Sequence, residues 1–269
     1  MSAILNGKFT VVWLGLATFV WSMLFVWQGL DFTDMGFWIT SYQQLYIDPG
    51  AMGFLSVCWL SAFIGHWVGV ALGGSVLAYK LGDGAVVTSS AMIAYQLLAS
   101  QLGRSRMLAA MVLLTVFFTR GYYGNWISYY DLTTLFYLAG ATLLFSGLAG
   151  NRKWLVVLAG VVLGANTFVR LPNLLGITLV SAVWLHAWVN RGALRDLLTA
   201  SFGFLGGFTL GVALVWGLIV LHGQEAVYFQ GIHAIFTVAE DANSHHAGSE
   251  LLRLLINELA KAFIVALSI

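Results

Sequence analysis

Uninterrupted apolar blocks of about 20 residues, the length of a transmembrane helix, set the strongest limit on what this chain can fold into. No Asp, Glu, Lys or Arg occurs within residues 9–30, 84–103, 132–151, 171–190 and 197–221. Only 9% of the chain is charged, against roughly 25% in soluble domains, so a water-facing surface could not be covered. The blocks do not alternate polar with apolar residues, as barrel strands do. The sequence therefore predicts an all-α, polytopic transmembrane helical bundle.

The positions of the basic residues predict which side of the membrane each loop faces. Basic residues in short loops mark the cytoplasmic side, and here they form four clusters: Lys8, Arg104 with Arg106, Arg152 with Lys153, and Arg191 with Arg195. If all four are cytoplasmic, residues 49–79 make no net crossing and lie along, or dip into, the outer interface. We therefore expect about seven to eight spans, with outer-face juxtamembrane helices after the first. Most carboxylates then share the outer face.

Three acidic residues are candidates for chemistry on that outer face. Asp31 and Asp34 follow the first apolar block, where a carboxylate can act as a general base, bind a metal or simply end a helix in water. Asp131 opens the block 132–151, so it can be an N-cap or contact a substrate. Tyr130 precedes it in an aromatic connection that suits the membrane interface, and is a further candidate for substrate binding.

Two arginines and one histidine complete the set of candidates. Arg120 begins the aromatic connection, and Arg170 ends a short helix just before Pro172. An arginine near membrane depth is costly unless it is paired or reaches water, and its planar guanidinium suits phosphate. We expect Arg170 to pair with phosphate or carboxylate rather than only reach for water. His233 lies in residues 222–250, for which a solvated loop is expected in preference to a metal or phosphate site.

The order of these features resembles the GT-C superfamily of integral membrane glycosyltransferases, which includes protein mannosyltransferases and bacterial aminoarabinose transferases. An acidic motif of the D-E-G or D-T-G kind follows the first helix in that family, and Asp34-Met35-Gly36 matches it with Met in the middle. The basic turn 101–106, the pair Arg120 and Asp131, and the run 158–173 are similar to later family features. The resemblance extends over almost the whole chain.

This resemblance implies a polyprenyl-phosphate-linked sugar donor that is used on the extracytoplasmic face. Asp34 would activate the acceptor hydroxyl, and Asp131 would orient acceptor, donor or a metal. Arg120 and Arg170 would neutralise the departing lipid phosphate. Asp31, Tyr130 and His233 are further candidates for substrate contact. No cofactor is implied beyond a possible divalent cation, Mg²⁺ or Mn²⁺.

The remaining expectations concern the setting of the chain. We expect residues 1–269 to form a single transmembrane domain, the N-terminal portion of a longer family member, in the bacterial cytoplasmic membrane with its site facing outward. The partners are the lipid bilayer, the donor, and an acceptor glycan, lipid or protein. The net charge of +1 gives no reason to expect nucleic acid. A transporter or flippase of lipid-linked glycans, which would need polar groups along a membrane path, and a non-catalytic assembly subunit are the alternatives.

Overall fold

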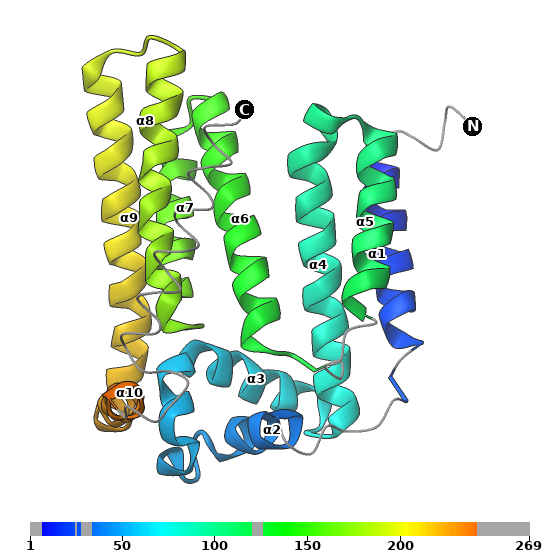
Figure 1. Cartoon of the computed structure of the whole chain (residues 1–269), viewed down its shortest axis with the longest axis vertical. Helices are drawn as coiled ribbons and strands as arrows, with labels where there is room; N and C mark the ends of the chain where they lie inside the picture. Colours follow the sequence, from blue (N-terminus) through cyan, green and yellow to red (C-terminus); the bar gives the residue numbers. More distant parts are fainter. Residues whose placement is uncertain (1–6, 25, 28–33, 120–125, 241–269) are drawn as a thin grey trace.

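The computed structural model describes residues 7–24, 26–27, 34–119 and 126–240, and every regular element in these ranges is helical (Figure 1). Long helices stand side by side and alternate in direction along the chain. They are α1 (Gly7–Met23), α4 (Val76–Leu102), α5 (Arg104–Thr119), α6 (Tyr129–Ala149), α7 (Lys153–Asn166), η3 (Leu171–Leu179) with α8 (Val180–Val189), and α9 (Leu194–Leu221).

Four helical segments in the described ranges are long and apolar enough to cross a membrane. They are Pro49–Leu72, Tyr129–Ala149, Leu171–Val189 and Leu194–Leu221, and shorter apolar helices cover Thr10–Met23 and Lys153–Asn166. The described part of the protein is therefore all-helical, with four helical segments of the kind that cross membranes, but the expected seven to eight spans are not established by these segments. The difference arises because α1 and α7 are short, and because Lys80 and Asp83 make α4 more polar.

A layer of shorter helices lies across the lower ends of the long ones in Figure 1. It contains α2 (Asp34–Gln44), η2 (Pro49–Cys58), α3 (Trp59–Leu72) and α10 (Glu225–Glu240). Although Pro49–Leu72 is long and apolar enough to span, it is kinked at Gly53, where φ is 53°, and it does not run beside the bundle. Since α1 arrives at this end and α4 leaves from it, the connection between them adds no crossing of the bundle.

The two ends of the bundle differ in charge. The helices α5, α7 and α9 begin at the upper end of Figure 1, at Arg104, Lys153 and Leu194. The helices α2 and α6 begin at the lower end, with Asp34 and Asp131 in their first turns. This separation follows from the alternating directions of the helices and agrees with the sidedness expected from the basic clusters.

The start of α10 is held against the lower layer by a buried glutamine. Gln224 accepts a hydrogen bond from Trp59 Nε1 at 2.5 Å and donates through Nε2 to the Leu45 carbonyl at 2.6 Å. Both Trp59 and Gln224 are buried, so these bonds form where water does not compete and are costly to leave unmade. The end of α9 is thereby fixed to the segments that follow α1.

The expectation of a solvated loop over residues 222–250 is wrong for residues 225–240, which form α10. This helix packs on η2, where Ser56 Oγ donates to the Val227 carbonyl at 3.0 Å. Tyr228 is buried in the same core. The packing of this amphipathic segment on η2 stabilises the helix. The sequence of residues 225–240, which is short and flanked by polar residues, does not reveal that packing.

The helices α7 and α9 touch along their backbones because glycines face each other across the contact. Gly160 and Gly164 lie one turn apart on α7, as do Gly207 and Gly211 on α9. A Cβ atom at Gly164 would lie 2.1 Å from the Phe208 carbonyl oxygen, and one at Gly207 would lie 2.1 Å from the Val157 carbonyl oxygen. Small residues four apart permit this close approach, which favours packing of helices in membranes.

Candidate functional site

A pair of carboxyl groups at the lower end of the bundle is the main chemical feature of the described chain. Asp83, in the second turn of α4, is buried, and Asp131, in the first turn of α6, is partly buried. The two carboxyl groups lie close enough to interact electrostatically, while Asp83 Oδ1 is buried without a hydrogen-bond partner among the described residues. Two adjacent carboxylates repel each other, which favours retention of a proton by one of them. The pair is thus suited to hold one negative charge.

Asp131 is not the N-cap of α6, one of the two roles expected for it. Ser128 is the N-cap, since its Oγ accepts a hydrogen bond from the Asp131 backbone N–H at 3.2 Å. The Ser128 hydroxyl in turn donates to Asp131 Oδ2. Serine at the N-cap with an acidic residue three positions later is a stabilising pattern for a helix start. Because Ser128 caps the helix, the Asp131 carboxyl is free to face Asp83.

The buried phenol of Tyr42 lies near this carboxyl pair. Tyr42, from α2, is fully buried and donates its hydroxyl to the Ile127 carbonyl at 2.8 Å. Burial raises the pKa of Tyr42 well above its ordinary value, and the nearby Cys58, Asp131, Tyr79 and Asp83 raise it further. The Tyr42 hydroxyl therefore stays neutral near neutral pH and acts as a fixed donor that joins α2 to the start of α6.

Replacing Tyr42 by Phe should lower the free energy of unfolding by about 1–2 kcal/mol, because the Ile127 carbonyl loses its donor in a buried place. The ring packing is kept, so the change isolates the hydroxyl. Thermal unfolding of the purified protein in detergent measures the effect. Tyr46→Phe is the control, since Tyr46 is exposed and its hydroxyl is 3.4 Å from His222 Nε2. Equal stability of the two variants would contradict the role given to the Tyr42 bond.

Arg170 lies in a bend between α7 and η3 that buried amides hold in place. Asn173 donates through Nδ2 to Asn166 Oδ1 at 3.0 Å and to Thr133 Oγ1 of α6 at 2.9 Å. The bend also contacts α3, because Ser61 Oγ donates to the Val169 carbonyl at 3.1 Å. Asn166 and Asn173 are buried, so these bonds fix the path of the chain on both sides of Arg170.

The guanidinium of Arg170 packs against two tyrosines at the start of α6. Its Cζ is 5.4 Å from the ring centroid of Tyr129 and 5.1 Å from that of Tyr130, distances at which a cation is attracted to an aromatic face. With the residues that the structure describes, Arg170 forms no ion pair. The arrangement holds a positive charge beside the turn that carries Asp131 and leaves its hydrogen-bond donors for an anion.

Asp34 lies at the same end of the bundle as the carboxyl pair, in the layer of shorter helices. It is the first residue of α2 and is exposed. One turn later, Trp38 packs its ring 4.9 Å from the ring of Tyr129, two residues before Asp131. Residues four apart share a helix face, so this contact places the start of α2 near the start of α6.

The other predicted site residues are distributed as follows. Tyr130 is exposed and contacts Arg170, so the structure brings these two together. His233 is exposed on α10, where its ring lies 3.3 Å from Thr237 Oγ1 of the same helix, and no described contact joins it to the carboxyl pair. Asp31 and Arg120 lie outside the described residues.

Asp83 is the residue of this site that the sequence did not single out. The apolar block predicted from the sequence begins at residue 84, just after Asp83, whereas α4 begins at Val76 and includes it. The available signal was an acidic residue with Lys80 three positions earlier, on the same side of any helix that starts before residue 84. Only the packing of α4 on α6 shows that Asp83 meets Asp131.

Few side chains in the described ranges could bind a divalent cation. The described ranges contain no group of three His, Cys, Asp or Glu side chains able to hold a metal ion. Asp83 and Asp131 are two carboxyl groups, and Mg²⁺ accepts one or two carboxylates when phosphate and water supply the other ligands. A divalent cation therefore stays a prediction.

Comparison with protein-family models, curated proteins and solved structures found no match to this chain.

Proposed function

We propose that this chain is an integral membrane transferase that moves a sugar from a polyprenyl-phosphate-linked donor to an acceptor at the acidic end of the bundle. The observation that carries the proposal is the grouping at this end of a carboxyl pair, an arginine without a described ion pair, and an exposed carboxylate. These groups lie in or beside the layer of short helices at the lower end of the bundle. At this end a lipid-linked donor can keep its tail among the long helices. The helices α1 and α4–α9 are proposed to be the spans.

The proposed reaction assigns one role to each of the charged groups. Asp34 takes the proton from the acceptor hydroxyl while that oxygen forms a bond to the anomeric carbon of the sugar. The bond between this carbon and the phosphate oxygen breaks, and its electron pair leaves with the polyprenyl phosphate. Arg170 stabilises the phosphate charge as it develops. Asp131, held by Ser128 and Asp83, is proposed to bind sugar or acceptor hydroxyls and thereby to orient the reacting atoms.

The direct test is release of polyprenyl phosphate from a defined donor. Liposomes containing the full chain are given polyprenyl-phosphate mannose or polyprenyl-phosphate glucose, tritiated in the lipid, together with an extract of envelope acceptors. The proposal expects release of the tritiated lipid phosphate together with transfer of sugar. If labelled donor only exchanges between the two leaflets and the sugar bond remains intact, the chain is a carrier and not a transferase.

Replacing Arg170 by Gln should lower donor turnover by about tenfold or more, because a charge-assisted contact to phosphate is lost. Arg170→Lys should recover only part of the activity, since an ammonium lacks the planar pair of donors. The rate at saturating and at low donor concentration separates loss of binding from loss of transition-state stabilisation. Full activity of Arg170→Gln, with the fold intact by circular dichroism, would remove Arg170 from the proposed site.

A carrier is the second candidate, because protonatable carboxyl groups inside membrane proteins are used to couple transport to protons. The pair of Asp83 and Asp131 is of this kind. Transporter sites, however, lie near the middle of the bundle between broken helices, whereas this pair lies near the starts of α4 and α6. This position favours the transferase.

A further inference from the structure

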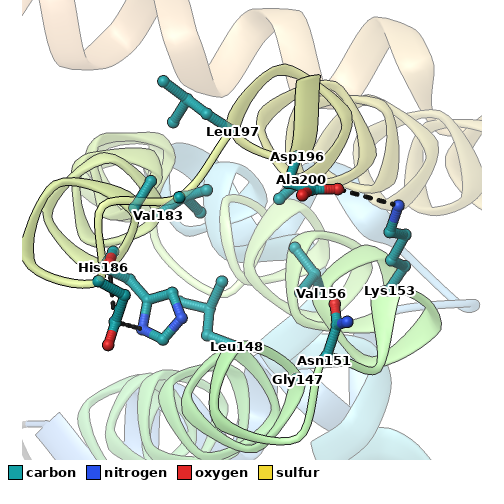
Figure 2. Close-up of a pocket in the computed structure, with 13 residues that line it drawn as sticks. Gly147, Leu148, Asn151, Lys153, Val156, Val183, His186, Asp196, Leu197 and Ala200 are labelled. Carbon is teal, nitrogen blue, oxygen red and sulfur yellow. Dashed lines mark hydrogen bonds and ion pairs between the residues drawn. The ribbon is translucent and has the colours of Figure 1, made fainter. Parts of the chain in front are cut away.

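A second site candidate lies at the opposite, basic end of the bundle, away from the carboxyl pair. A cavity of about 240 Å³ opens there between the last turns of α6 and α8 and the first turns of α7 and α9. Figure 2 shows Lys153 and Asp196 facing each other on one side of it and His186 on the other. The Lys153 Nζ and Asp196 Oδ1 atoms are 3.7 Å apart and both side chains are exposed. The cavity therefore has charged and polar groups on two sides of a largely apolar lining, and its charged side is exposed.

An apolar groove of about 360 Å³ adjoins this cavity and runs along the bundle between α6 and η3–α8. Leu148, His186 and Asn190 line both spaces, so the cavity with the Lys153–Asp196 pair passes directly into the apolar groove. The groove is open to the outside, since Phe145, Leu185 and Val189 are exposed. These helices are apolar enough to cross a membrane, so the groove lies at the depth of the lipid chains.

The charge around the cavity selects the kind of headgroup that would fit. The two turns that border it, residues 151–153 and 190–196, contain four basic residues and one acidic residue: Arg152, Lys153, Arg191, Arg195 and Asp196. The balance of these two turns is therefore +3, from four positive and one negative charge, and Lys153 and Asp196 are the two of the five that line the cavity itself. Basic pockets between transmembrane helices at the cytoplasmic side bind anionic lipid headgroups.

We propose that this end of the protein holds an anionic glycerophospholipid of the surrounding membrane. The phosphate lies in the cavity near Lys153 and His186, and one acyl chain follows the groove along α6 and α8. Such a lipid would fill the space between α6 and α8 and stabilise the packing of the second half of the bundle. This site is separate from the proposed transferase site and does not depend on it.

Native mass spectrometry of the detergent-purified full chain tests the proposal by titration with phosphatidylglycerol and with phosphatidylcholine of the same acyl chains. Phosphatidylglycerol should bind at least about fivefold more tightly, and Lys153→Gln should weaken this binding by about fivefold. Asp196→Asn should not weaken it, because the change removes a negative charge and releases Lys153. Ala182→Phe, which fills the groove, should reduce binding, whereas Ala213→Phe, on an exposed position of α9 outside both spaces, should not.

Three results would overturn the proposal. Equal or tighter binding of phosphatidylcholine or phosphatidylethanolamine would exclude selectivity for an anionic headgroup. Lys153 is exposed, so Lys153→Gln leaves the fold intact. Unchanged lipid binding in this variant would exclude the cavity as the site of the headgroup. Competition by inorganic phosphate or glycerophosphoglycerol as strong as that of the whole lipid would show a site for a free anion, with no role for the groove.

Discussion

Asp34→Asn should lower the rate of sugar transfer by about 10²–10⁴-fold, the usual contribution of a general base. The substitution keeps the size and shape of the side chain but removes its ability to accept the acceptor proton. Asp34 is exposed at the first turn of α2, so little of the fold depends on it. Donor affinity should stay within a few-fold of wild type, since the proposed contact is to the acceptor hydroxyl, and the loss should appear in kcat.

The matched control is Asp48→Asn, which removes another exposed carboxylate from the same end of the chain. Asp48 precedes η2 and makes no side-chain capping bond, so its replacement should leave transfer within about twofold of wild type. Similar losses in the two variants would indicate a general effect of charge at this end. An active Asp34→Asn protein would exclude Asp34 as the base and would direct attention to Asp131.

Gly207→Ala should lower the melting temperature by about 5–10 °C, the expected result of overpacking by about 2–3 kcal/mol in a chain of this size. The added Cβ would lie 2.1 Å from the Val157 carbonyl oxygen. The obstacle is a backbone atom in α7, which cannot turn away as a side chain can. The helices α7 and α9 must therefore separate, and contacts along the whole interface weaken.

The neighbouring residue provides the control for this prediction. A Cβ atom at Gly206 meets nothing within 4 Å, so Gly206→Ala should be neutral or slightly stabilising, since Ala is the better helix former. Thermal unfolding of both variants in one detergent gives the comparison. If Gly207→Ala unfolds at the temperature of Gly206→Ala, the close approach of α7 and α9 is wrong.

The sequence was informative about the class of the protein and the polarity of its ends. Long blocks without charge predict membrane helices wherever they occur, because the cost of an unpaired charge in lipid does not depend on the partner helix. The basic turns at Arg104 and Lys153 likewise predicted that these helix starts share one end. For residues 49–79 the same reasoning predicted no net crossing, although the length and composition of Pro49–Leu72 alone suit a span, and how this segment lies in a membrane stays a prediction.

The sequence was less informative about the chemical site. Asp131 could be selected because it opens an apolar helix, but its local surroundings were equally consistent with a capping role. The capping by Ser128 and the partner Asp83 became apparent only in the fold. Residues 225–240 were expected to be a loop, but they form a helix. This helix is stabilised by contacts with η2, about 170 positions earlier in the chain, and the local sequence does not show such distant contacts.

The sequence by itself determined that this chain is a helical membrane protein with a basic and an acidic end. Apolar length and loop charge are local properties that act on each helix separately. Only the tertiary structure decided that Asp83 meets Asp131, that Arg170 packs on Tyr129 and Tyr130, and that glycines of α7 and α9 meet. Each of these contacts joins separate helices and depends on their rotation and register, which apolar periodicity leaves open when a helix is apolar on every side.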